Sequence, residues 1–191
     1  MASGWLADAN TAPASLLDPF CGSGVIPIEA ALLARGVAPG RHRRFAFMNW
    51  PGFDAALWSG LVADADQQSS EQSARLAGSL HILASDRAAG ASAQAKPNAE
   101  RAGVADTIEF SVRAISAIEP PEQAGWIVTN PPYGIRITAE QDLRNLYARF
   151  GAVLRAKCLG WRVAILCSEP QLLRQTQLTL DSELSLVNGG V

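Results

Sequence analysis

The stretch Ser15-Leu16-Leu17-Asp18-Pro19-Phe20-Cys21-Gly22-Ser23-Gly24 joins an apolar, strand-like run to a helix-like segment. Its two glycines allow a tight turn and let a ligand approach the backbone without meeting a Cβ atom. The start of the following helix supplies free N–H groups and a partial positive charge. No Lys-Ser or Lys-Thr pair follows the second glycine, so this is not a phosphate loop. The stretch predicts a Gly-rich cofactor loop, with a plain Gly-rich turn as the alternative.

Short apolar runs alternate with helix-like stretches along the 191 residues, which is typical of an α/β protein with a mostly parallel sheet. Parallel strands are buried on both faces, so continuous apolar runs are expected. The expected strands are residues 15–17, 80–84, 107–112, 125–129 and 161–167, with a sixth at 183–187 before the hairpin signal Asn188-Gly189-Gly190. We expect a single domain over residues 1–191.

The expected helices are residues 24–35, 88–101 and 141–157. Gly36 is a stop signal for the first, and the last carries one continuous apolar stripe. Pro97 is expected to kink or stop the second helix near its end. Residues 39–79 exceed what a strand-helix-strand crossover needs, so we interpret them as an insertion with its own helix.

The tetrapeptide Asn130-Pro131-Pro132-Tyr133 follows the fourth expected strand. The Asn130 side-chain oxygen and the Pro131 carbonyl can both accept hydrogen bonds from one exocyclic amine. The prolines fix φ and remove competing N–H donors, and Tyr133 offers a flat face on which a base can stack. This pattern predicts a site for a planar group that carries an NH₂, against the alternative of a Pro-rich loop with an Asn cap.

Asp86 lies just after the second expected strand. An acidic residue at that place commonly pairs with the ribose hydroxyls of a nucleoside cofactor. The other interpretation is a helix N-cap, which Ser85 or Asp86 would fill. Both interpretations stay open from position alone.

Composition indicates a globular chain in a reducing compartment. The three cysteines, Cys21, Cys158 and Cys167, have neither the even count of a disulfide framework nor zinc-ligand spacing. No apolar run approaches the roughly 20 residues of a membrane span, and we find no signal peptide. We therefore expect a cytoplasmic setting. The net charge of −2 means that nucleic acid must be bound by a local basic patch or by another domain.

Together, the Asp18–Gly24 and Asn130–Tyr133 motifs resemble the S-adenosylmethionine-dependent amino-methyltransferases. Ile28-Glu29-Ala30-Ala31, Ala38-Pro39-Gly40 and the Trp-rich insertion narrow this resemblance to the catalytic domain of the RNA guanine-N2 methyltransferases that carry a THUMP domain, especially those acting on bacterial 23S ribosomal RNA. The resemblance runs from about residue 16 to 190. The Pro-Pro-Tyr motif alone also occurs in DNA adenine and protein glutamine methylases.

The resemblance implies a Rossmann-like class I methyltransferase fold with helices on both faces, sheet order 3-2-1-4-5, a sixth strand and no last strand. It implies S-adenosylmethionine as cofactor and no metal. Asp18, Gly22 and Gly24 would line its methionine part, and the cofactor site would also include Phe20 and Cys21 of the same loop and Asn130. Asp86 would hold the ribose, and Asn130, Pro131, Pro132 and Tyr133 would hold the target amine and base. We interpret Cys21 as a packing residue rather than a nucleophile.

The sequence departs from the family in two places. Family members often carry an acidic residue just after the third strand, where Arg113-Ala114-Ile115 stands here. The upstream THUMP domain and the last strand are not in this sequence, which suggests an excised domain or a degenerate copy.

We expect methyl transfer to guanine N2 in structured RNA, with ribosomal RNA favoured over transfer RNA as the substrate. Arg136, Arg43 and Arg44 are the candidate contacts to the RNA. For the cluster Arg35 to Arg44, a solvated loop is the equally weighted alternative. The competing functions are a DNA adenine-N6 methyltransferase and a vestigial, non-catalytic RNA-binding domain.

Overall fold

The computed structural model describes residues 5, 15–41, 43–133 and 140–181. Its described strands form one parallel sheet in the order β3-β2-β1-β4-β5, as predicted. The strands are β1 (Leu16–Asp18), β2 (Ile82–Asp86), β3 (Ile108–Val112), β4 (Trp126–Thr129) and β5 (Arg162–Ile165). The sixth strand expected at residues 183–187 lies outside the described residues.

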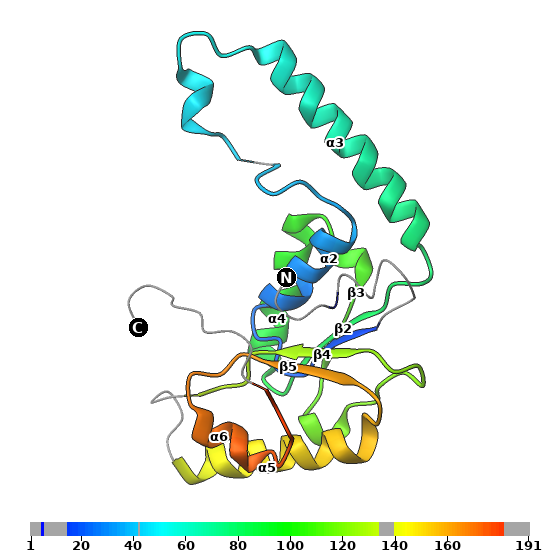
Figure 1. Ribbon diagram of the computed structural model, residues 1–191, viewed down its shortest axis with the longest axis vertical. Coiled ribbons are helices and arrows are strands. Elements are labelled where there is room, and N and C mark those ends of the chain that lie inside the picture. The colour runs from blue at the N-terminus through cyan, green and yellow to red at the C-terminus, as the bar shows by residue number, and fades with distance from the viewer. Residues whose placement is uncertain (1–4, 6–14, 42, 134–139, 182–191) are drawn as a thin grey trace.

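Helices cover both faces of this sheet (Figure 1). The α-helices are α2 (Val25–Ala34), α3 (Ala55–Leu76), α4 (Ala89–Ala102), α5 (Glu140–Lys157) and α6 (Pro170–Gln175). Short 3₁₀ helices are η1 (Ala46–Asn49), η2 (Ala105–Thr107) and η3 (Ile115–Ala117). In Figure 1, α2 and α4 lie on one side of the sheet, and α5 and α6 lie on the other. The fold is a Rossmann-like three-layer α/β architecture.

Each face of the sheet has its own hydrophobic core. Leu16 packs with Ala31 of α2 and Ala99 of α4 in one core. Its neighbour Leu17 packs with Phe150 of α5 in the other. Successive strand residues point to opposite faces, so two adjacent leucines supply both layers. The continuous apolar pattern of the central strands is thereby explained.

The structure refines two predictions about local structure. The helix expected over residues 88–101 is confirmed as α4, and Pro97 does not stop it, because α4 continues to Ala102 and ends at Gly103, whose φ is 73°. Ala95 and Ala99, on either side of Pro97, are fully buried, and this packing outweighs the roughly 3 kcal/mol that an interior proline costs. Asp86 does not follow β2 but ends it, since the ladder with β3 continues to the pair Asp86 and Val112.

The stretch predicted to be an insertion carries η1 and α3. Figure 1 shows α3 rising away from the sheet. The stretch begins after the end of α2 and leads back into the start of β2. None of the residues of α3 is buried. Among the described residues, no helix is both long and apolar enough to cross a membrane.

Candidate active site

The two motif loops meet at the carboxyl edge of the sheet. β1 and β4 are neighbours, with Leu17 opposite Ile127. The Thr129 hydroxyl, at the end of β4, donates a 2.6 Å hydrogen bond to Oδ1 of Asp18, at the end of β1. The Gly-rich loop and the Asn130–Tyr133 segment therefore start at the ends of neighbouring strands, from two residues that share a hydrogen bond. This is the edge where ligands bind in open α/β sheets.

Asp18 is enclosed by protein, with only 1% of its surface exposed. Its Oδ1 also accepts a 3.1 Å hydrogen bond from the Phe20 backbone N–H. Burial raises the pKa of this carboxyl from 3.8 to about 7, the hydrogen bonds from Thr129 and Phe20 oppose the rise, and the charge of Asp86 adds to it. These contacts make Asp18 the anchor of both loops, and its predicted contact with the methionine part of a cofactor stays a prediction.

The two motif glycines have different surroundings. Both need glycine, because their φ angles are 53° at Gly22 and 88° at Gly24. A Cβ on Gly24 would lie 3.1 Å from the Cβ of Ala95 in α4, so this glycine permits close helix packing. A Cβ on Gly22 would meet nothing within 4 Å. Gly22 is thus the one that faces open space, where a ligand has room.

Asp86 bonds both to the entrance of α4 and to the Gly-rich loop, but the predicted N-cap was wrong, because Ala88 is the N-cap of α4 and no side chain caps it. Its Oδ1 accepts a 2.8 Å hydrogen bond from Ala88 N, at the entrance to α4, and its Oδ2 accepts one of 3.2 Å from Gly22 N. One oxygen therefore orders the start of a helix, and the other reaches the Gly-rich loop. The carboxylate lies beside the loop, where the ribose contact was predicted, and that contact itself stays a prediction.

Phe20 and Cys21 face the protein interior. The Phe20 ring meets Phe150 of α5 edge to face, with 5.3 Å between centroids. Cys21 is buried, and burial raises the pKa of its thiol to about 12, with the charges of Asp18 and Asp86 adding to the rise. A thiol that stays protonated is a poor nucleophile, which agrees with the interpretation of Cys21 as a packing residue.

The Asn130–Tyr133 segment combines a buried and a half-buried proline with exposed polar side chains. Pro131 is buried and Pro132 is half-buried, whereas Asn130 is exposed and the Tyr133 side chain is 36% exposed. The amide and the ring are thus available to a ligand, while the prolines hold the backbone to the protein. Their roles toward a target amine and base stay predictions.

The position after β3 holds an ion pair instead of the expected acid. Arg113 donates a 2.8 Å hydrogen bond to Glu119 through its side chain, and its backbone N–H binds the Asp86 carbonyl at 3.0 Å. Ile115 is buried. Glu119 therefore brings a carboxylate near the end of β3 from a position that the motif does not indicate.

The arginines of the predicted basic cluster differ in their surroundings. Arg43 and Arg44 are exposed, and Arg44 donates a hydrogen bond to Asn49. Arg41 pairs with Asp66 of α3 through two hydrogen bonds, so its charge is neutralised within the protein. Arg136 lies outside the described residues.

Sequence reasoning missed three residues that shape the loop. Thr129 bonds to Asp18, the Ser85 carbonyl accepts from Cys21 N at 3.0 Å, and the Asn98 amide donates to the Ser23 carbonyl at 2.8 Å. A hydroxyl in the apolar run before Asn130 was the available signal for Thr129. In the part of the chain that the structure describes, no group of three or more His, Cys, Asp and Glu side chains could hold a metal ion.

A Rossmann-like sheet with a Gly-rich loop after β1, an acid ending β2 and Asn-Pro-Pro-Tyr after β4 defines a class I methyltransferase domain, whose methyl donor is S-adenosylmethionine. The chain belongs to the UPF0020 family, whose model, described as RMKL-like, methyltransferase domain, matches residues 1–190. The chain is 42% identical over 190 residues to the ribosomal RNA large subunit methyltransferase K/L of Shewanella sp. (strain W3-18-1). That match covers 99% of this chain and 26% of the relative, so the chain spans about a quarter of its length.

Solved structures share the fold. SMU.472, crystallised in complex with SAH (S-adenosylhomocysteine), is 28% identical with a TM-score of 0.85, over 99% of this chain and 49% of that one. A predicted N6-adenine-specific DNA methylase from Listeria monocytogenes str. 4b F2365 is 30% identical with a TM-score of 0.76, over 92% and 46%. The chain thus resembles methylases named for different nucleic acids.

Proposed function

We propose that this domain transfers a methyl group from S-adenosylmethionine to the exocyclic N2 of a guanine in structured RNA, in particular ribosomal RNA. The observation that carries the proposal is the joining of the Gly-rich loop to the Asn130 segment through Thr129 and Asp18. The relative's name, a large-subunit ribosomal RNA methyltransferase, supports RNA as the substrate.

S-adenosylmethionine supplies an electrophilic methyl on a sulfonium. The open space above Gly22 and the carboxylate of Asp86 beside it fit a cofactor with a ribose and an amino acid part. In this proposal, Asp86 binds the ribose hydroxyls and the loop N–H groups line the amino acid part. Phe20 and Cys21 support the loop from beneath.

Asn130 Oδ1 and the Pro131 carbonyl accept the two hydrogens of the target amine. Held in this way, the amine would present its nitrogen lone pair to the methyl group that S-adenosylmethionine would supply, and it would release one proton to solvent on becoming methylated. Tyr133 stacks on the base, which has to be unstacked from the RNA to reach the pocket. Orientation of this kind is worth about 7–11 kcal/mol of the barrier.

Arg43, Arg44 and Arg136 are proposed to contact RNA phosphates. We also propose that a THUMP domain, in the same or another chain, delivers the RNA, and that the protein works in the cytoplasm. The three cysteines, free in the structure, are compatible with that compartment.

DNA adenine-N6 methylation is the second candidate, favoured by the likeness to the Listeria protein. The decisive assay supplies tritiated S-adenosylmethionine with 23S ribosomal RNA, transfer RNA or adenine-containing duplex DNA, followed by nucleoside chromatography. We expect label in N2-methylguanosine from RNA. Label in N6-methyladenine from DNA would replace the proposal, and a millimolar or weaker affinity for the cofactor by calorimetry would identify a vestigial domain.

A further inference from the structure

Residues 38–79, here called the arm, leave the body after α2 and return to it before β2. The arm comprises a loop with η1 and the long helix α3, and it rises well clear of the sheet (Figure 1). In that view the strands end on the left, and the loop with η1 rises on the same side while α3 returns on the right. Because α3 buries none of its residues and Leu76 at its end only partly packs against the core, core packing does not account for most of its 22 residues.

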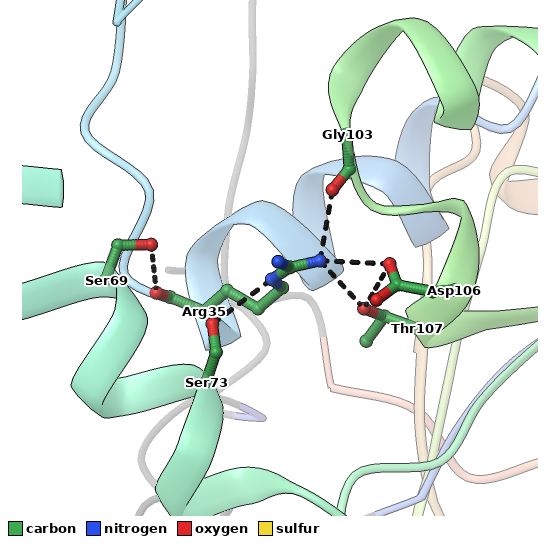
Figure 2. A network of polar contacts seen from close by, with 6 residues as sticks. All are labelled: Arg35, Ser69, Ser73, Gly103, Asp106 and Thr107. Carbon is green, nitrogen blue, oxygen red and sulfur yellow. Dashed lines mark hydrogen bonds and ion pairs between the residues drawn. The ribbon is translucent and has the colours of Figure 1, made fainter. Parts of the chain in front are cut away.

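The root of the arm is fixed by Arg35, at the end of α2 (Figure 2). Its backbone carbonyl accepts a 2.9 Å hydrogen bond from the Ser69 hydroxyl, and its Nε donates to the Ser73 hydroxyl at 3.2 Å. Both serines belong to the C-terminal half of α3, so one arginine holds this half of the helix against α2.

The same guanidinium also binds the body of the domain. Nη1 of Arg35 donates to the Gly103 carbonyl at 3.0 Å, to Asp106 Oδ1 at 3.0 Å and to the Thr107 hydroxyl at 3.3 Å (Figure 2). Arg35 therefore bridges α3 to η2 and the end of α4. This fixes the direction in which the arm extends, and it makes Arg35 a structural residue rather than an RNA contact.

The far part of the arm has its own small aromatic cluster. Phe47 stacks on Phe45 at 5.4 Å and meets Trp58 of α3 edge to face at 5.5 Å, and Phe45 also meets Trp58 edge to face at 6.0 Å. Gly40 has φ of 77°, and a Cβ there would lie 2.7 Å from the Phe45 ring. The cluster and the Arg41–Asp66 pair hold the loop onto α3.

Exposed on the same loop are one large aromatic side chain and two arginines. Trp50 is 67% exposed, and Arg43 and Arg44 are exposed on the same loop. Residues 41–53 contain no acidic residue, although the whole chain carries a net charge of −2. Arg44 bonds to Asn49, the residue next to Trp50, and an exposed indole on a loop with two exposed arginines matches the two recognition elements of single-stranded RNA, which are base faces and phosphates.

We propose that Arg43, Arg44 and Trp50, here called the arm tip, bind a single-stranded segment of the RNA substrate at a distance from the methylation pocket. Trp50 stacks on a base while Arg43 and Arg44 pair with phosphates. This inference rests on the proposed function in that the substrate is RNA. It assigns to the arm the task of holding RNA, while Asn130 and Tyr133 hold the target base.

The test measures binding of a fluorescein-labelled single-stranded RNA and of a duplex of the same sequence by fluorescence anisotropy over a range of salt concentrations. Trp50→Ala should weaken single-strand binding by about 5-fold or more. The double change Arg43→Gln and Arg44→Gln should weaken it about 10-fold and lower the salt slope by about 1.4, since each phosphate contact contributes about 0.7. The matched control, Arg149→Gln with Arg174→Gln, removes the same charge from exposed positions on α5 and α6, across the sheet from α2, and should have little effect.

Cofactor affinity, measured by calorimetry with SAH, should be unchanged in all these variants. Arm-tip variants that bind RNA as the control does, in a protein that still methylates RNA, would overturn the arm-tip contact and leave the proposed function standing. That outcome would favour a protein partner on the exposed Leu57 and Leu61 of α3. A wild-type protein that binds and methylates no RNA would overturn both.

Discussion

The Thr129 hydroxyl and the Asp18 carboxyl form a buried hydrogen bond of 2.6 Å between residues 111 positions apart in the chain. The bond links the last residues of β1 and β4 at the carboxyl edge of the sheet. It joins the loop that would hold a cofactor to the segment that would hold a target amine. The relative position of the two loops therefore depends on this contact and on the pairing of β1 with β4.

Replacing Thr129 with Val removes the hydroxyl and keeps the shape of the side chain. We expect a loss of about 1–3 kcal/mol in the free energy of unfolding, because Asp18 stays buried without this donor. Methyl transfer should fall more than cofactor affinity, since the alignment of the two loops is disturbed. Urea denaturation and calorimetry with SAH measure the two effects. Thr129→Ser keeps the hydroxyl and should restore most of the activity, and a Ser variant as inactive as Val would contradict this role.

The raised pKa of Asp18 predicts a stability that falls as pH rises. The folded protein keeps this proton up to about pH 7, whereas the unfolded chain releases it near 3.8. Between these values the folded state binds more protons, so this contribution to stability is present at low pH and is lost as pH rises through about 7. Between pH 5 and pH 8 the loss should be on the order of 2 kcal/mol.

Asp18→Asn is the matched variant, because its amide oxygen can accept the same hydrogen bonds without titrating. Urea denaturation at pH 5 and pH 8 should show a smaller pH difference in this variant than in the wild type. Identical pH differences in the two proteins would show that Asp18 is not the titrating group.

The two motif glycines should respond differently to alanine. Gly24→Ala introduces a methyl group 3.1 Å from Ala95 at a φ of 88°, so we expect a loss of stability of about 2–4 kcal/mol. Gly22→Ala has room for the methyl group and should cost only about 1–2 kcal/mol, from its positive φ. It should nevertheless weaken SAH binding more strongly, because the methyl group enters the space above the loop. Thermal denaturation measures the loss of stability in both variants, and calorimetry measures their affinity for SAH. Equal effects of the two changes on SAH binding would refute the prediction.

Asn130→Ala tests the role of the amide in methyl transfer. If Asn130 holds the target amine, its loss should abolish transfer and leave the affinity for SAH nearly intact. The exposed position of Asn130 means that folding should be unaffected, which circular dichroism can verify. A parallel loss of SAH binding would place Asn130 on the cofactor instead.

Most of the sheet was predictable from sequence because its signals are local. Apolar runs marked the described strands to within about two residues, and the predicted strand order was confirmed. The amphipathic pattern of α5 was equally reliable, with its start only one residue from the prediction. Whether Pro97 stops its helix could not be decided from sequence, because the burial of Ala95 and Ala99 that offsets the local penalty of a proline is visible only in the tertiary structure.

The sequence by itself determined which residues lie at the carboxyl edge of the sheet, since the strands and the loops that follow them depend on patterns within short segments, while the order of the strands was predicted from the family resemblance. Only the tertiary structure decided what those residues do there. It buried Asp18 against Thr129, turned Gly24 toward α4 and Gly22 toward open space, and engaged Arg35 in the root of the arm. These assignments depend on which segments meet across the register of parallel strands and the packing of helices. No short stretch of sequence contains that information.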